Sequence, residues 1–242
     1  MVAPTPSLEA AVMRAMFDAG RLLVISPHLD DGALGCGLLL TAAARARVVT
    51  VYTAMPAAAP AATKWDRDCG FADSRDAMRA RLDEDARAMA VLGAEAGHLE
   101  FLDSQYGPLP SRERLAKALA GEIDAYAPDV VAMPLGLHHC DHERVREAAL
   151  LVLPQRRRLL WVGYEDEFYR YRAGVLQRVL GQLARRRVRA TPIECAGQGD
   201  PERKRLAVAA YASQLRAVGL HTPDAAVDAG ERYWWLDAAG GG

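Results

Sequence analysis

Short apolar segments alternate with helical patterns along most of the chain, and this alternation limits the choice of fold more than any other feature. The first segment, RLLVISP (21–27), is a run of β-forming residues bounded by Gly20 and Pro27. Further strands are expected at 47–54, 98–103, 129–134, 159–166 and 188–195, with helices at 33–46, 74–93, 111–128, 141–153, 174–186 and 201–217. Strands that alternate with helices predict an α/β fold, with a Rossmann-like, mostly parallel sheet and helices on both faces.

Composition limits the number of domains and the class of partner. The chain has 242 residues, 51% of them hydrophobic, and shows no internal repeat or low-complexity linker, so we expect a single domain over 1–242. Its formal net charge of −1 gives no reason to expect a nucleic-acid partner. No segment reaches the roughly 18–20 consecutive apolar residues of a membrane span. The four cysteines form no paired motif and segment 1–20 lacks a signal-peptide pattern, so we expect a cytoplasmic protein.

Two clusters of polar side chains follow strands that lie far apart in the sequence. His28, Asp30 and Asp31 follow the first strand, and His138, His139, Asp141 and His142 follow the strand at 129–134. Both clusters are expected at one edge of the sheet, because the carboxyl ends of parallel strands meet there. The adjacent carboxylates of Asp30 and Asp31 require a compensating positive charge if they are buried. Imidazole and carboxylate groups suit a divalent transition metal, and three protein ligands with an open position are typical of a catalytic site.

The segment GALGCG (32–37) also follows a strand and opens a helix, which is where dinucleotide-binding proteins carry their glycines. Its spacing is G-x-x-G-x-G instead of G-x-G-x-x-G, and the two aspartates before it would repel a pyrophosphate. We therefore interpret the small residues as positions where the helix packs closely on the sheet. A nucleotide- or methyl-donor-dependent transferase stays open as an alternative function, as does a non-catalytic carbohydrate-binding protein with a structural metal.

The motifs HLDD (28–31) and HCDH (139–142) resemble the A-H-P-D-D-E and H-P-D-H signatures of the PIG-L/LmbE-like zinc-dependent N-acetylglucosaminyl de-N-acetylases. Collinear but weaker matches are RLDEDARAMAVLG (81–93), YEDEFY (164–169), KRLAVAAYASQ (204–214) and ERYWWL (231–236). The resemblance thus extends over residues 21–236.

The chain departs from the family signatures at four positions. Pro27, Leu29, Gly32 and Cys140 stand where the family has Ala, Pro, Glu and Pro. None of these differences removes a presumed metal ligand. We interpret Cys140 as a packed small side chain in preference to a fourth ligand.

The resemblance implies a hydrolase that removes an acetyl group from an N-acetylamino sugar or glycoconjugate, by attack of a zinc-bound water on the amide. It implies one Zn²⁺ per chain, held by His28, Asp31 and His142, although this donor set also accommodates other divalent transition metals. Asp30 is then the expected general base. His139 is expected to stabilise the oxyanion or to protonate the leaving amine, and Asp141 to orient an imidazole.

The resemblance also implies where the substrate binds. Arg81, Asp103, Tyr164 and Asp166 are candidate contacts for sugar hydroxyls because of their positions in the family pattern. Trp65 lies on the long segment 55–74, which has the length of a functional loop. We expect its indole to cover the substrate as part of a lid, with an anchor of the loop in the core as the alternative. The expected partner is a small sugar or glycoconjugate, and the sequence leaves open whether the chain forms a homo-oligomer.

Overall fold

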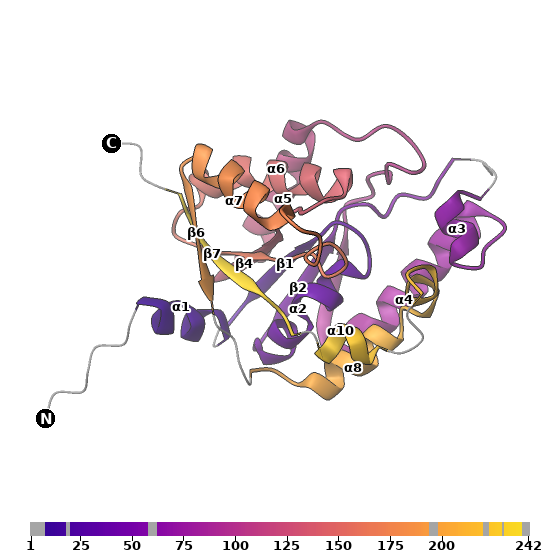
Figure 1. The fold of residues 1–242 in the computed structure, drawn as a ribbon, viewed down its shortest axis with the longest axis horizontal. Coiled ribbons are helices and arrows are strands. Elements are labelled where there is room, and N and C mark those ends of the chain that lie inside the picture. The colour runs from indigo at the N-terminus through magenta and orange to yellow at the C-terminus, as the bar shows by residue number, and fades with distance from the viewer. Residues whose placement is uncertain are drawn as a thin grey trace, which may run out of the picture.

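A seven-stranded sheet forms the centre of the protein, as a computed structural model shows (Figure 1). The structure describes residues 8–17, 20–57, 62–193, 198–219, 223–228 and 230–238. The strands are β1 (Leu22–Ser26), β2 (Ala46–Thr50), β3 (Ala94–His98), β4 (Val130–Pro134), β5 (Leu160–Tyr164), β6 (Val188–Ile193) and β7 (Tyr233–Ala238). Their order in the sheet is β3-β2-β1-β4-β5-β7-β6. The first five strands pair in parallel, whereas β7 is antiparallel to both β5 and β6. The predicted α/β fold with a mostly parallel sheet is confirmed.

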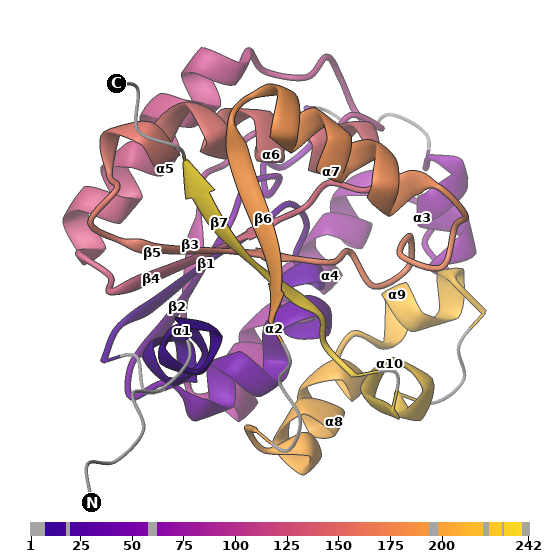
Figure 2. The ribbon, with the colours of Figure 1, turned by 60° about the vertical axis from the view of Figure 1, so that its left-hand side comes forward.

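Helices cover both faces of this sheet (Figure 2). The described helices are α1 (Leu8–Phe17), α2 (Asp31–Ala42), α3 (Lys64–Asp68), α4 (Ser74–Leu92), α5 (Arg112–Tyr126), α6 (Cys140–Val152), η1 (Leu153–Gln155), α7 (Val175–Arg185), α8 (Pro201–Ala209), α9 (Ala212–Ala217) and α10 (Asp224–Asp228). Apolar side chains of α5, α6 and α7 pack on one face, and those of α1, α2, α4 and α8 pack on the other. Among the helices of the described residues, none has the length and apolar character that a membrane crossing requires.

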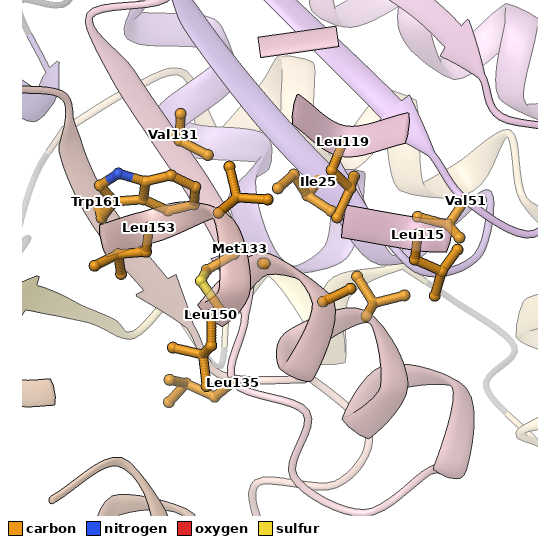
Figure 3. Packing of buried hydrophobic residues seen from close by; sticks show 14 of the residues in the cluster. Ile25, Val51, Leu115, Leu119, Val131, Met133, Leu135, Leu150, Leu153 and Trp161 are labelled. Carbon is orange, nitrogen blue, oxygen red and sulfur yellow. The ribbon is translucent and has the colours of Figure 1, made fainter. Parts of the chain in front are cut away.

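The apolar strands β1 and β4 are buried on both faces, which explains their uninterrupted hydrophobic sequences. In β1, Leu23 and Ile25 belong to the cluster under α5 and α6, whereas Leu22 and Val24 belong to the cluster under α2 and α4. Figure 3 shows the first cluster, in which Ile25 lies among side chains of β4 and the neighbouring helices. The burial of these strands determines their place in the sheet, and therefore the edge at which their carboxyl ends lie.

The structure differs from the sequence expectations at several boundaries. The prediction of a strand at 98–103 was wrong. Strand β3 begins directly after Gly93, the left-handed C-cap of α4, and ends at His98. Its sequence, AEAGH, has no large apolar side chain and is mostly exposed at the sheet edge, so hydrophobic periodicity does not detect it. The helix expected at 201–217 is two helices, with a break at Ala210 and Tyr211. Strand β7 was not expected, and residues 194–195 of the strand expected at 188–195 lie outside the described residues.

The long segment 55–74 also contains an element that was not expected. Thr63 forms a capping box with Asp66, which begins the short helix α3. The threonine hydroxyl accepts a hydrogen bond from the Asp66 amide, and the Asp66 carboxylate accepts one from the Thr63 amide. Four residues of the segment, 58–61, lie outside the described residues.

Candidate metal centre

The two histidine motifs meet at the carboxyl edge of the sheet because β1 and β4 are neighbouring parallel strands. The chain leaves β1 at Ser26 and places His28 before α2, whose first residue is Asp31. It leaves β4 at Pro134 and reaches His142 in the first turn of α6. The imidazoles of His28 and His142 lie side by side, with 5.1 Å between their ring centroids.

Three potential ligand atoms form a nearly equilateral triangle at this position. His28 Nδ1 lies 3.2 Å from His142 Nε2. Asp31 Oδ2 lies 3.3 Å from each of these two nitrogen atoms. Two nitrogen or oxygen ligands of a tetrahedral zinc ion, each about 2.0–2.1 Å from the metal, are about 3.3 Å apart. The three atoms therefore have the mutual separations that one tetrahedral cation requires.

Carboxylates fix the orientation of both imidazoles. His28 Nε2 donates to Asp141 Oδ2 at 2.9 Å, and His142 Nδ1 donates to Asp166 Oδ1. Asp166 also accepts a hydrogen bond from the Leu137 amide through Oδ2, at 2.9 Å. When either ring is neutral, its outer nitrogen carries the donated proton and its inner nitrogen directs a lone pair into the triangle. Hydrogen bonds thus prepare the rings as metal ligands.

The charges around the triangle favour a cation. Burial and the neighbouring Asp31 carboxylate raise the pKa of Asp30 to about 7. Burial alone would lower the pKa of His28, but its hydrogen bonds to Asp141 and Asp31 outweigh that effect and raise it. Both changes reflect a surplus of carboxylates in a buried place. A divalent ion at the triangle would compensate that surplus, which answers why Asp30 and Asp31 are adjacent.

His139 lies beside the triangle as the N-cap of α6. Its Nδ1 accepts a hydrogen bond from the Asp141 amide at 3.3 Å, and its ring stacks on Tyr169. Burial, together with the charge of His28, lowers the pKa of His139, which favours its neutral form. One nitrogen each of His28, His139 and His142 also lie within 4.8 Å of one another, so His139 is an alternative third ligand. The equal separations favour Asp31 for that position.

A cavity of about 170 Å³ opens next to the triangle. Its lining consists of His28, Leu29, Asp30, Asp31, Tyr52, Trp65, Met78, Arg81, Asp103, Gln105, His139, His142, Phe168, Tyr169, Tyr211 and Gln214. Polar groups capable of proton transfer or hydrogen bonding are thus combined with several aromatic and apolar side chains. This combination is typical of a site that binds a small organic molecule.

Comparison with protein families identifies the group to which this architecture belongs. A model of the PIG-L family, described as GlcNAc-PI de-N-acetylase, matches residues 23–153, which is more than half of the chain. The chain belongs to the PIG-L family. The match contains both histidine motifs and ends at the last turn of α6. No curated protein gave a match.

Solved structures similar to this PIG-L chain include a deacetylase of the A40926 pseudoaglycone and deacetylases from the biosynthesis pathway of teicoplanin. A deacetylase–bog complex from the teicoplanin pathway is 26% identical, with a TM-score of 0.75 over 92% of this chain and 100% of that one. The A40926 pseudoaglycone deacetylase Dbv21 is 25% identical, with a TM-score of 0.73 over 93% and 100% of the two chains. A zinc-inhibited form of the teicoplanin deacetylase Orf2 is 25% identical, with a TM-score of 0.73 over 89% and 97%. The chain therefore matches these proteins over nearly their full lengths.

Three of the five residues expected to bind substrate line the cavity of the PIG-L chain. Arg81 is buried, and its guanidinium lies 3.1 Å from Asp66 Oδ1. Asp103 accepts two hydrogen bonds from Gln105, one from its backbone N–H and one from its side-chain Nε2. The indole of Trp65 is 36% exposed and donates to Gln214 Oε1 at 3.1 Å. These side chains are held in place before any ligand binds.

The other two residues, Tyr164 and Asp166, do not belong to the cavity lining. The Tyr164 hydroxyl donates to the Ile25 carbonyl at 2.9 Å, and its ring is buried. Asp166 is also buried, and its carboxylate is engaged by His142 and Leu137. The geometry places both residues behind the site, where they support other side chains.

The glycines of GALGCG pack against buried side chains. A Cβ atom on Gly35 would lie 2.6 Å from the ring of Tyr164, and one on Gly37 would lie 2.7 Å from the stem of Lys204. These close approaches require glycine because any side chain would collide. The close helix–sheet packing expected for these small residues is therefore observed at Gly35, which lies against Tyr164 of β5.

Sequence reasoning missed half of the cavity lining. Tyr52 and Gln105 follow β2 and β3, so their position after parallel strands was a usable signal. Tyr211 and Gln214 belong to the segment that resembles the family's Y-x-S-Q pattern, but nothing in that pattern says that they reach the site. In contrast, His138 was grouped with the site, whereas its exposed ring lies 2.7 Å from an Arg172 nitrogen and outside the cavity lining.

Proposed function

We propose that this protein is a metal-dependent deacetylase that hydrolyses the N-acetyl amide of an amino sugar or glycoconjugate. The observation that carries the proposal is the triangle of His28, Asp31 and His142, which lies at the wall of a cavity that also contains Asp30 and His139. Membership of the PIG-L family supports the reaction. The similar deacetylases of the A40926 pseudoaglycone and of the teicoplanin pathway support an N-acetylated glycoconjugate as substrate.

His28, Asp31 and His142 are proposed to hold one divalent ion, with zinc as the preferred metal. The donor set of two imidazoles and one carboxylate is common at catalytic zinc sites. When bound, the ion supplies a Lewis acid that polarises the amide carbonyl and lowers the pKa of a coordinated water towards about 7. Asp141 and Asp166 keep the two imidazoles in the orientation and tautomer that this binding needs.

Asp30 is proposed as the general base that takes a proton from the attacking water. It precedes α2 without capping that helix through its side chain, and it lines the cavity. Its neighbour Asp31 belongs to the metal triangle, so the two adjacent carboxylates have different tasks. Asp30 is thereby next in sequence to a proposed metal ligand, and its carboxylate is still free to exchange a proton.

His139 is proposed to act on the other side of the reacting amide. Its ring lines the cavity, and its centroid lies 5.5 Å from that of His28. An N–H of this ring could donate to the oxyanion that develops on the amide, or a proton could pass to the departing amine. The Asp141 amide fixes the ring by donating to Nδ1, which leaves Nε2 as the proton-carrying atom.

The sugar is proposed to bind against Arg81 and Asp103, with Trp65 at the rim of the cavity. A guanidinium donates hydrogen bonds and a carboxylate accepts them, so this pair is suited to neighbouring hydroxyl groups. The exposed part of the Trp65 indole offers an apolar face to the CH groups of a sugar or to an attached aglycone. Tyr164 and Asp166 are assigned a supporting role because their side chains do not reach the cavity.

The test combines metal content with acetate release. Purified protein is assayed against N-acetylated amino sugars and N-acetylated glycopeptide pseudoaglycones, with and without a chelator. We expect acetate release that the chelator abolishes and that zinc restores. His142→Ala should lose both the stoichiometric metal and the activity.

His138→Ala is the matched control, because His138 is a nearby histidine outside the cavity lining. It should keep metal and activity. Full acetate release after complete metal removal, or a full equivalent of metal bound by His142→Ala at unchanged affinity, would contradict the proposal.

A further inference from the structure

Cys140 introduces a thiol at a position where the proposed mechanism does not use one. It is the first residue of α6 and is exposed, whereas the other two described cysteines, Cys36 and Cys69, are buried. The family signature has proline at this position, so the thiol is a feature of this chain. Its Sγ lies 3.5 Å from Asp141 Oδ1 and 3.6 Å from Ser104 Oγ.

The thiol belongs to a second cluster of potential metal ligands. One ligand atom each of His139, Cys140 and Asp141 lie within 4.8 Å of one another. For a tetrahedral zinc ion with a sulfur ligand at about 2.3 Å and an oxygen ligand at about 2.0 Å, the two ligand atoms are about 3.5 Å apart. The separation of Cys140 Sγ from Asp141 Oδ1 is therefore already that of two ligands of one ion.

Asp141 can contribute to this cluster without giving up its other contact. Its Oδ2 accepts the hydrogen bonds from His28 Nε2, at 2.9 Å, and from the Ser104 amide, at 3.4 Å. Its Oδ1 faces Cys140. One carboxylate can thus orient His28 through one oxygen and bind a second ion through the other.

His139 connects the second cluster to the proposed reaction. Its Nδ1 accepts a long hydrogen bond from the Asp141 backbone amide, at 3.3 Å, and lies 3.9 Å from Asp141 Oδ2, and its side chain is 36% exposed. The same residue is also near the ligand atoms of His28 and His142. A metal ion that takes a ring nitrogen of His139 therefore removes this residue from the cavity chemistry while the first triangle stays intact.

We propose that His139, Cys140 and Asp141 form a second metal site, which binds a thiol-seeking divalent ion such as zinc or cadmium and inhibits the enzyme. Binding forms a metal–sulfur bond, and the thiol proton passes to solvent, with no change in oxidation state. The thiolate ligand selects zinc or cadmium over magnesium and calcium, which prefer oxygen. The inhibitory consequence rests on the proposed function, whereas the binding itself does not.

The test starts from protein that already contains one equivalent of zinc. Cadmium is added, and the cadmium–thiolate charge-transfer band is followed in the ultraviolet. Wild-type protein should develop the band and saturate it with one further equivalent of cadmium, and Cys140→Ser should not develop it. Cys195→Ser is the matched control for the cysteine that lies outside the described residues, and it should keep the band.

Acetate release is measured in parallel as excess zinc is added. The rate of each variant is expressed relative to the rate of the same variant with one equivalent of zinc. In Cys140→Ser, the zinc concentration at which activity falls to half should be at least about tenfold higher than in wild-type protein. Loss of an outer contact already lowers the affinity of a metal site by about 10–100-fold. Cys140→Pro is a second variant, because proline is well accepted at the first position of a helix.

The two readouts separate the proposals. A band that depends on Cys140, in protein that releases no acetate, would support the second site and count against the deacetylase. Acetate release without a band in zinc-loaded wild-type protein would overturn the second site and leave the deacetylase standing. A band that persists in both Cys140 variants would also overturn it.

Discussion

At the scale of single residues, the site depends on pairs of carboxylates and imidazoles with separate tasks. Asp31 and Asp30 are adjacent in the chain, yet only Asp31 belongs to the metal triangle. Asp166 and Asp141 each hold the outer nitrogen of one imidazole. These assignments follow from the atom that each carboxylate faces. Substitutions that change the charge of one carboxylate without changing its size can test each role separately.

Asp30→Asn keeps the size of the side chain but removes its ability to accept a proton. We expect the variant to bind metal normally and to lose turnover by about 10²–10⁴-fold, the usual contribution of a positioned acid or base. The measurement is kcat at saturating substrate, together with metal content. Wild-type turnover in a metal-loaded Asp30→Asn protein would remove this residue from the mechanism.

Asp166→Asn weakens the acceptor that orients His142. We expect metal affinity to fall by about 10–100-fold, the usual effect of losing an outer carboxylate partner of a metal-binding histidine. Metal affinity is measured by competition with a chelating indicator. Glu143→Gln is the control, because it changes a partly exposed carboxylate next to His142 that pairs with Arg178 instead. Equal affinities in the two variants would show that Asp166 does not tune the metal site.

At the scale of elements, the segment around α3 is held as a wall of the cavity. Asp66 is fully buried, and its Oδ1 accepts a hydrogen bond from the Tyr106 hydroxyl at 2.6 Å and lies 3.1 Å from an Arg81 nitrogen. The Thr63 capping box fixes the start of the helix. Trp65 is carried on this anchored helix, so its partly exposed indole is presented to the cavity from a fixed support.

Trp65→Ala is expected to affect substrate binding more than stability. The anchoring contacts of α3 are made by Asp66, and the indole adds one hydrogen bond to Gln214. We expect the KM for a large glycoconjugate to rise by about tenfold, which is about 1.4 kcal/mol. The KM for free N-acetylglucosamine should rise less, because a smaller molecule reaches less of the rim. The melting temperature should fall by only about 2–4 °C, as for a loss of about 1 kcal/mol in a chain of this size.

Thermal melting and KM are measured on the same preparations, with Trp161→Phe as a contrast because Trp161 is buried in the core. A large fall in melting temperature with unchanged KM values would mean that Trp65 anchors the segment and does not contact substrate.

Several elements could be predicted from the sequence because burial leaves a clear pattern. The strands β1 and β4 are covered on both faces and are continuous apolar runs, and their parallel pairing explains why the two histidine motifs meet. Edge strand β3 has no large apolar side chain and is mostly exposed, so the same reasoning failed there. Strand β7 has a clear aromatic sequence, YWWLDA, but its antiparallel place between β5 and β6 depends on long-range packing.

The site was predictable only where chemistry restricts the residue type. Histidines and aspartates that follow two strand ends suit a metal. The choice of His28, Asp31 and His142 as its ligands came from the resemblance to the family signatures and stays a prediction. Side-chain direction was not predictable: Tyr164 and Arg81 were both candidates from the family pattern, yet only Arg81 reaches the cavity. Direction depends on packing, and Tyr164 points away because Gly35 leaves space for its ring under α2.

At the scale of the whole molecule, a buried ion pair joins three parts of the chain that lie far apart in sequence. Lys204 of α8 is fully buried, and its Nζ lies 2.7 Å from Glu231 Oε1 and 2.9 Å from the Leu34 carbonyl of α2. Glu231 also accepts a hydrogen bond from the Leu38 amide, at 2.9 Å, and precedes β7. The pair therefore connects the C-terminal strand to the helices that cover one face of the sheet.

Lys204→Met should destabilise the protein strongly although it introduces an apolar side chain of similar length. It leaves the Glu231 carboxylate buried without its cation, and breaking a buried pair in this way costs about 3–5 kcal/mol. We expect the free energy of unfolding in denaturant to fall by that amount. Arg189→Met is the matched control, because Arg189 pairs with Asp237 at the exposed surface of β6 and β7, where such a pair contributes about 0–1 kcal/mol. The double variant Lys204→Met with Glu231→Gln should recover part of the loss, since it removes the uncompensated charge. Equal stabilities of Lys204→Met and Arg189→Met would show that the pair does not hold the C-terminal strand to the rest of the fold.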